Sequence, residues 1–324
     1  MALLVSLGHR LLHVVGLLLA VLILNFALIH LAPGDPAEVI AGTMGGVTEE
    51  VLAEIRRAYG LDQPFHVQLL TYLGRIAQGD LGYSYYFNLP VVQLIAERVL
   101  PTLLLVLSAL ILSVVLGTFL GVLTARKPES GFSHLITLFS LAGNSAPVFW
   151  TGIVLLILFA SVWPIFPVTG MQSAIREPGF LAAALDILHH LVLPMLTLAI
   201  IYLAQYSRLS RASMLDVLGS DYIRTARAKG LSERKVIFKH ALRNAVLPVI
   251  TMAGLQFGNM FAGAVLVETV FNWPGMGRLA FESILRRDSP TILGILFFSA
   301  LIVVIANLLT DLAYRLVDPR IKLK

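Results

Sequence analysis

Residues 101–125 read PTLLLVLSALILSVVLGTFLGVLTA and contain no charged side chain. A bilayer core about 30 Å thick needs roughly 20 apolar residues to be crossed by a helix, and this stretch is long enough. Five further apolar stretches occur along the chain, at 11–31, 135–163, 189–206, 245–270 and 291–316. The sequence therefore predicts an all-α integral membrane protein with six transmembrane helices.

The composition agrees with a membrane protein. Of the 324 residues, 57% are hydrophobic and 13% are charged, whereas soluble domains carry about 25% charged residues. The chain has no cysteine, which excludes disulfides, thiolate catalysis and cysteine-ligated zinc. The net charge of +5 is attributed to basic loops at the membrane surface, and no nucleic acid partner is expected.

The distribution of basic residues predicts the orientation. If the N-terminus is cytoplasmic, the inner segments hold 16 of the 24 Lys and Arg residues but 6 of the 19 Asp and Glu residues. Cytoplasmic loops are enriched in Lys and Arg. Nine of these basic residues lie between positions 207 and 244. We therefore expect both termini to be cytoplasmic.

Residues 32–100 are too polar to cross a membrane and are predicted to lie outside. Thr48 can cap a helix that has acids in its first turn, arginines in its last turn and Gly60 as its terminator. A second short helix is expected from His66 to Gln78, before Gly79. The predicted domains are an N-terminal transmembrane helix, an extracytoplasmic lid and a five-helix core with a cytoplasmic loop. Their bounds are 1–31, 32–100 and 101–324, with the loop at 207–244.

Glycine and proline predict two packing features in the apolar stretches. Gly117 and Gly121 stand four residues apart, as do Gly254 and Gly258, and small residues so spaced let helix backbones approach closely in lipid. Pro147 interrupts the third stretch, where it predicts a kink whose freed backbone groups need protein or water as partners.

The loop at 207–244 predicts a helix, a glycine turn and a second helix. Ser220 or Asp221 can cap the first helix, Gly230 supplies a left-handed exit, and Ser232 opens the second helix, which runs towards Pro248. A rigid projection of this kind could transmit motion from a docked motor. The alternative is a basic loop that binds anionic lipid headgroups. The alanine–glycine pattern in the first helix favours docking.

Residues 224–230, RTARAKG, resemble the EAA loop of bacterial ABC importer permeases, in the variant of the dipeptide, oligopeptide and nickel (DppB/OppB) type. Further matching motifs occur in order along the chain: PGDP at 33–36, GLDQP at 60–64, GDLG at 79–82, PVFW at 147–150, ETVF at 268–271, WPGMGR at 273–278 and DPR at 318–320. The sequence departs from the general importer pattern in two places. Arg224 stands where the glutamate that gives the EAA loop its name would be, and HALR at 240–243 replaces an Ile-x-Leu-Pro ending. Both departures resemble the peptide branch of the family.

The resemblance implies a type I, MetI-like permease fold in the bacterial cytoplasmic (inner) membrane. It implies a multi-pass subunit that moves di- or oligopeptides into the cell, with nickel or a glutathione-type cargo as the alternative. The implied partners are a second homologous permease subunit, two ATP-binding subunits docking at 221–235 and an extracytoplasmic substrate-binding protein. The implied coupling residues are Arg224, Thr225, Ala226, Arg227, Ala228, Lys229 and Gly230.

Several catalytic motifs are absent from the sequence. It has no phosphate loop of the form GxxxxGK[ST], so ATP and Mg²⁺ are expected on partner subunits and no cofactor on this chain. Neither HExxH nor GxSxG occurs, so no enzymatic activity is expected. No metal site is expected either, because adjacent residues such as His189 and His190 point about 100° apart on a helix.

An ion-coupled secondary transporter is the alternative from another class. Such proteins hold ionisable groups near the bilayer midplane, whereas Glu268 and Asp311 fall near the ends of their stretches. The midplanes offer neutral polar residues, which suits a conduit without proton coupling. The candidate residues of a translocation path are Asn144, Ser145, Gln256 and Asn259. Gln256 and Asn259 share a helix face and could line this path or bond a neighbouring helix.

Overall fold

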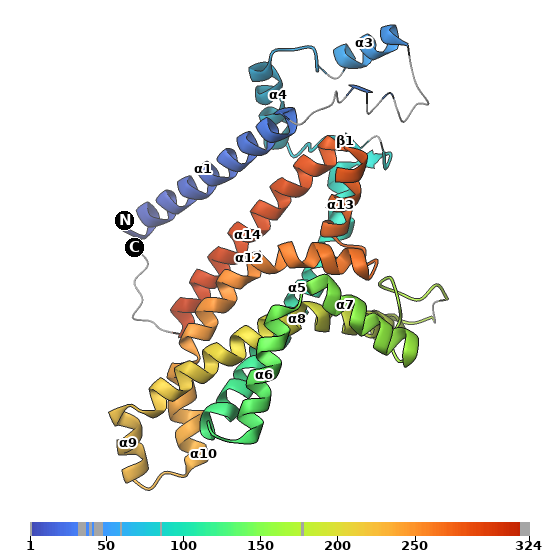
Figure 1. The fold of residues 1–324 in the computed structure, drawn as a ribbon. Coiled ribbons are helices and arrows are strands. Elements are labelled where there is room, and N and C mark those ends of the chain that lie inside the picture. The colour runs from blue at the N-terminus through green and yellow to red at the C-terminus, as the bar shows by residue number, and fades with distance from the viewer. Residues whose placement is uncertain are drawn as a thin grey trace. The chain divides into compact units, whose positions relative to one another are not determined.

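The computed structural model describes residues 2–31, 37–38, 41, 48–58, 60–84, 86–175 and 178–317, and most of these residues are helical (Figure 1). The chain divides into two compact units, residues 1–100 with 278–305 and residues 101–277 with 306–324. Three helices contribute residues to both units: α5 (Val91–Arg126), α13 (Met276–Arg286) and α14 (Ser289–Val317). The predicted all-α class is confirmed.

The first unit contains α1 (Ala2–Leu31), α3 (Glu49–Ala58) and α4 (Phe65–Ala77). Helix α3 has glutamates in its first turn and arginines in its last turn, which complements the helix dipole. Gly60 and Gly79 follow α3 and α4 with positive φ angles of 65° and 80°. The two short helices and their glycine terminators are therefore confirmed. Motifs 33–36 and 318–320 lie outside the described residues.

A short hairpin in the first unit is fixed to the start of α14 by a buried carboxylate. Its strands, β1 (Tyr83–Ser84) and β2 (Leu89–Pro90), pair antiparallel. The Ser84 hydroxyl donates to Asp288 Oδ2 at 2.5 Å, and the Thr291 hydroxyl donates to the same oxygen at 2.7 Å. Because Asp288 is buried, these bonds supply the partners that a buried carboxylate needs.

The second unit is built around the long helix α8 (Phe180–Leu218). Helices α6 (Gly131–Ser145), α7 (Val148–Leu156) and α12 (Leu247–Val270) pack against it, and π-helical η1 (Ile157–Val162) continues α7. Four short elements connect α8 to α12: α9 (Asp221–Ala228), α10 (Glu233–Lys235), η2 (Val236–Ala241) and α11 (Leu242–Ala245). Helices α9 and α10 lie at one end of this unit (Figure 1).

Glycines bring membrane helices of this unit close together. A Cβ atom on Gly117 would lie 2.7 Å from the Tyr206 Cβ atom, and one on Gly121 would lie 2.6 Å from the Ser207 carbonyl oxygen. A Cβ atom on Gly254 would collide with the Thr310 side chain. The predicted close packing is therefore confirmed for these three glycines, which join α5 to α8 and α12 to α14.

Four helices in the described part of the chain are long and apolar enough to cross a membrane: Val91–Arg126, Phe180–Leu218, Leu247–Val270 and Ser289–Leu308. The pair Gly131–Gly143 and Val148–Val162 is a fifth candidate, bent by 108°. The break falls beside Pro147, as predicted, but it is much sharper than a kink. Ala146 is extended (ψ 133°), the conformation that a following proline favours. The predicted first span corresponds to the apolar helix Leu12–Leu28 in α1, which is shorter than the four spanning helices. The sixth span therefore stays a prediction.

The end of α12 is held by a buried glutamate. The chain turns back at residues 271–277, here called the Glu268 turn. The Thr102 hydroxyl donates to Glu268 Oε1 at 2.6 Å and accepts from the Met276 N–H at 2.8 Å. The Trp273 indole N–H donates to the Pro101 carbonyl at 3.0 Å. The ETVF and WPGMGR motifs thus fasten α12 to α5.

Candidate functional site

The segment between α8 and α12, residues 219–246, is here called the knob. Helix α8 ends at Leu218, and Ser220 takes the N-cap position of α9 with an extended backbone (ψ 154°). Its hydroxyl donates back to the Val217 carbonyl at 2.6 Å and makes no capping bond to α9. The prediction of a side-chain cap is therefore wrong for Ser220. Asp221 supplies negative charge at the helix start, where the dipole favours it.

The predicted left-handed exit from α9 is confirmed at Gly230, whose φ angle is +75°. The Gly230 N–H donates to the Arg227 carbonyl at 2.9 Å, and the Leu231 N–H donates to the Ala226 carbonyl at 3.4 Å. This pair of bonds is the Schellman motif, which satisfies carbonyls at a helix end. Nothing lies within 4 Å of a Cβ atom placed on Gly230, so the backbone angle alone calls for glycine here.

The return from the turn differs from the single helix that the sequence predicts. Ser232 precedes the one-turn α10, and the next six residues, Val236–Ala241, are π-helical. The wider winding adds a residue to the turn and changes the direction of the side chains that follow. Helix α12 then begins at Leu247 with Pro248 in its first turn, where the missing N–H of proline leaves no intrahelical bond unmade.

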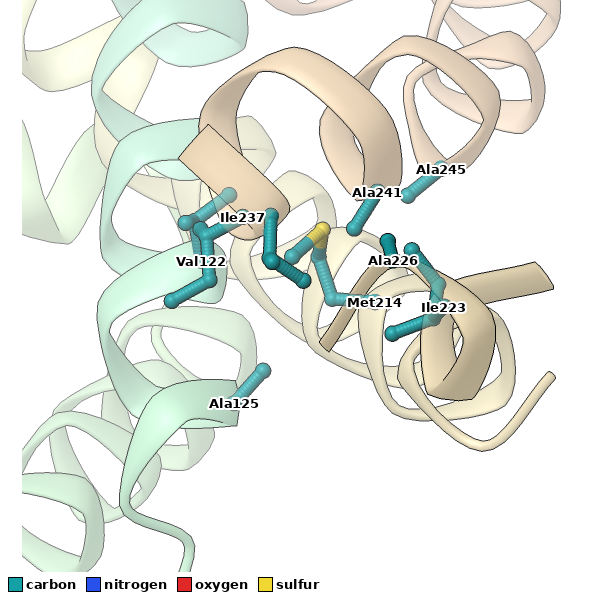
Figure 2. Close-up of a cluster of buried hydrophobic side chains, with 9 residues drawn as sticks. Val122, Ala125, Met214, Ile223, Ala226, Ile237, Ala241 and Ala245 are labelled. Atoms are coloured by element: carbon teal, nitrogen blue, oxygen red, sulfur yellow. The ribbon is translucent and has the colours of Figure 1, made fainter. Parts of the chain in front are cut away.

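The knob has a hydrophobic core that it shares with membrane helices (Figure 2). Met214 of α8 lies at the centre of this core, with Ile237 of η2 and Ile223 of α9 close to it. The buried members of the core are Val122, Ala125, Met214, Ile223, Ala226, Val236, Ile237, Ala241 and Ala245. Burying each larger side chain stabilises the packing by about 1.5–3 kcal/mol. The knob is thereby fixed to the ends of α5 and α8, and it continues directly into α12.

The exposed surface of the knob is predominantly basic. The exposed cationic residues are Arg224, Arg227, Lys229, Arg234, Lys235, Lys239 and Arg243. Arg227 Nη2 lies 2.8 Å from Glu233 Oε1, which bridges the glycine turn. The hydrogen bond from Arg227 lowers the pKa of Glu233, and the same bond raises the pKa of Arg227. A second brace joins the ends of the knob, because the Asn244 side chain donates to the Tyr222 hydroxyl at 2.8 Å.

The residues of the RTARAKG motif divide into two groups. Ala226 is buried in the core of the knob, together with Ile223 one turn earlier. The other six motif residues are exposed: Arg224, Thr225, Arg227, Ala228, Lys229 and Gly230. Of the two alanines in the motif, Ala228 is exposed and Ala226 is buried. The sequence signal for the inner face was the apolar Ile223 in an otherwise polar helix.

The candidate path residues do not form one cluster. The Ser145 hydroxyl donates to the Leu141 carbonyl of its own helix at 3.0 Å, and the side chain of Asn144 lies outside the described residues. Gln256 and Asn259 are bonded to each other at 2.7 Å, and Gln256 also donates to Gln205 of α8 at 2.6 Å. Gln205 was missed because no spacing rule links positions 51 residues apart. An amide inside the apolar stretch 189–206 was the available signal.

Two protein-family models match this chain and together cover most of it. Residues 113–323 match the family described as binding-protein-dependent transport system inner membrane component. Residues 3–107 match the N-terminal family of the same transport-system membrane components.

Curated relatives match over nearly the whole chain. The dipeptide transport system permease protein DppB of Escherichia coli K12 is 40% identical, with 96% of each chain covered. The oligopeptide transport system permease protein AppB of Bacillus subtilis is also 40% identical, over 97% of this chain and 98% of that protein. The di/tripeptide transport system permease protein DppB of Pseudomonas aeruginosa is 42% identical, over 93% of this chain and 94% of that protein.

A solved structure supports the fold. An inward-facing structure of the MetNI methionine ABC transporter matches with a TM-score of 0.54 at 16% identity, over 70% of this chain and 97% of that chain. At this identity the likeness concerns the fold alone. It agrees with the type I, MetI-like architecture that the sequence motifs imply.

Proposed function

Because this chain belongs to the family of binding-protein-dependent transport system inner membrane components, we propose that it is the permease subunit of an ABC importer for di- or oligopeptides. The peptide cargo rests on the relatives, whose names specify dipeptide, oligopeptide and di/tripeptide transport. Nickel and a glutathione-type cargo remain the alternatives within the same family. The chain itself catalyses no reaction in this proposal.

The observation that carries the proposal is the core that the knob shares with membrane helices. Ile223 and Ala226 of α9 pack with Met214 of α8 and Val122 of α5. Packed side chains transmit displacement because interiors are as dense as organic crystals and compress little. A force on the exposed face of α9 therefore moves the ends of α5 and α8 directly, and reaches α12 through α11.

The proposed partners follow from this arrangement. Two ATP-binding subunits bind ATP and Mg²⁺. One of them docks at residues 221–235, which contain five of the seven exposed cationic residues of the knob and the glycine turn. A second homologous permease subunit completes the path through the membrane. An extracytoplasmic binding protein delivers the cargo and sets most of its selectivity.

The experiment is uptake into proteoliposomes that contain this chain, its permease partner, the ATP-binding subunits and the binding protein. We expect uptake of a labelled dipeptide that requires ATP and all subunits, with no accumulation of labelled nickel or glutathione. Transport by the chain without ATP-binding subunits, driven by an ion gradient, would identify a secondary transporter instead. ATP-dependent uptake of nickel or glutathione in place of the dipeptide would support the proposed importer but contradict the proposed peptide cargo.

A further inference from the structure

Three amide side chains form a continuous hydrogen-bonded row between α8 and α12. Gln256 donates through Nε2 to Gln205 Oε1 at 2.6 Å, and Gln256 Oε1 accepts from Asn259 Nδ2 at 2.7 Å. Gln256 is 8% exposed, Gln205 is half-buried and Asn259 is exposed. The middle amide is therefore enclosed, while both ends of the row reach the surface of the unit.

The row has a donor at one end and an acceptor at the other. Each amide carries one carbonyl oxygen and one NH₂ group, and the two bonds of the row use opposite ends of Gln256. The Asn259 carbonyl and the Gln205 NH₂ group remain, and neither has a hydrogen-bond partner among the described residues. If all three amides are turned over, the two ends exchange roles and one donor and one acceptor still remain.

Close packing of the two helices holds the row in place. Next to the amides along the same helix interface, a Cβ atom on Gly263 would lie 3.2 Å from the Leu198 side chain, and Met260 is fully buried. Within the row, the bond between Gln205 and Gln256 is the one that links α8 to α12. Asn259 adds an exposed amide in the middle of a membrane helix, where polar side chains face the bundle interior or a water-filled cavity.

We propose that this row is a subsite that binds the main chain of the passing peptide, an inference that rests on the proposed peptide cargo. The Asn259 carbonyl accepts a hydrogen bond from a peptide N–H, and the Gln205 NH₂ group donates to a peptide C=O. A peptide unit carries this same pair of groups whatever its side chains are. The subsite therefore holds different peptides without selecting among their side chains. Gln256 touches no peptide and is a positioning residue that fixes the other two amides.

The test is a cycle that combines changes in the permease with changes in the peptide. The complete transporter in proteoliposomes is given a dipeptide and the same dipeptide methylated on its peptide nitrogen, which cannot donate a hydrogen bond. Uptake of both is measured for the unchanged chain and for Asn259→Leu. The same binding protein delivers the peptides to both forms, so its own preference cancels from the ratio.

We expect Asn259→Leu to lower uptake of the plain dipeptide by about twofold to twelvefold, the effect of one hydrogen bond of roughly 0.5–1.5 kcal/mol. N-methylation should then cost little more in this variant, so the two changes are not additive. Gln205→Met should lower uptake of both peptides by the same factor, because Gln205 binds the carbonyl. Thr251→Val, which removes an exposed hydroxyl of α12 that bonds its own helix, should leave uptake unchanged.

Additive effects of Asn259→Leu and N-methylation would overturn the subsite, and so would an equal loss in Thr251→Val. Loss of co-purification with the second permease subunit in both Asn259→Leu and the milder Asn259→Ser would also overturn it, because the row would then belong to the subunit interface. If only Asn259→Leu fails to assemble, Asn259→Ser carries the same cycle. Absence of any dipeptide uptake by the unchanged transporter would reject the proposed function itself, which separates the two failures.

Discussion

The knob and the Glu268 turn both rely on glycine, but for opposite physical reasons. Gly230 has a φ angle of +75° and open space around it. Gly275 lies against the Glu268 carboxylate, where a Cβ atom would overlap the carboxylate atoms. One glycine is required by the backbone angle and the other by the lack of room. The comparison distinguishes an exposed turn from a turn that is a buried joint.

Gly275→Ala should produce the largest effect, because the added methyl group has no space beside Glu268. Overpacking of this kind costs about 1–3 kcal/mol, and displacement of the buried carboxylate adds to it. We expect a clear fall in the amount of folded protein and in its thermal midpoint in detergent. The control is Gly219→Ala, where the added Cβ atom meets nothing closer than 3.5 Å. Equal stability of the two variants would mean that the Glu268 turn is not a packed joint.

Thr102→Val tests the same joint with no change in volume. The variant removes the hydroxyl that donates to Glu268 and accepts from the Met276 N–H. Leaving buried polar groups without that partner should cost about 1–3 kcal/mol. Thermal unfolding should show the loss, and Thr102→Ser, which keeps the hydroxyl, should restore most of it. If serine behaves like valine, the hydroxyl contributes nothing and only the shape of the side chain matters.

Gly230→Val tests the exposed glycine turn of the knob, for comparison with the buried Glu268 turn. A left-handed conformation costs a residue with a Cβ atom about 1–2 kcal/mol, and the strain falls on an exposed turn. We expect normal membrane insertion and only a small fall in the thermal midpoint, but impaired uptake per ATP hydrolysed, measured in proteoliposomes. Gly230→Asn should be milder because asparagine tolerates this region better. Unchanged coupling in the valine variant would contradict a mechanical role for the turn.

The ion pair between Arg227 and Glu233 should give the smallest effect, because exposed pairs contribute about 0–1 kcal/mol. Arg227 lowers the pKa of Glu233, so the contribution is present above the ordinary pKa of glutamate and is lost as the pH falls through the lowered value. Hydrogen exchange at Gly230 and Leu231, corrected for intrinsic rates, should rise on acidification. In Glu233→Gln the exchange should already be faster at neutral pH and should show no such rise.

The sequence predicts the knob better than it predicts the joint because glycine turns are local. Acids, cations and Gly230 stand at fixed positions around one short helix, and residues of these types at these positions predict where the helix begins and ends. The π-helical return at Val236–Ala241 was not predictable, since no residue pattern in the segment distinguishes it from an α-helix. Its side chains Val236, Ile237 and Ala241 pack in the core shared with α8 and α5, contacts that no local pattern specifies.

Long-range contacts account for the remaining differences. The motifs containing Glu268 and Gly275 could be quoted from the sequence, but their attachment to Thr102 joins residues 166 positions apart. The same limit applies to Gln205 and Gln256. Helix lengths and glycine spacing were predictable because both follow from the chemistry of one stretch. The partners of polar side chains depend on which helices meet.

The most direct test of the central claim uses the absence of cysteine in this chain. Ala228 and Ala226 lie two residues apart on α9, the first exposed and the second buried. In the assembled transporter, Ala228→Cys should form a cross-link to an ATP-binding subunit through a short bifunctional reagent, and Ala226→Cys should not. ATP hydrolysis should change the yield at position 228. No cross-link from position 228, in a complex that still takes up peptide with ATP, would contradict the account of the knob as the coupling site.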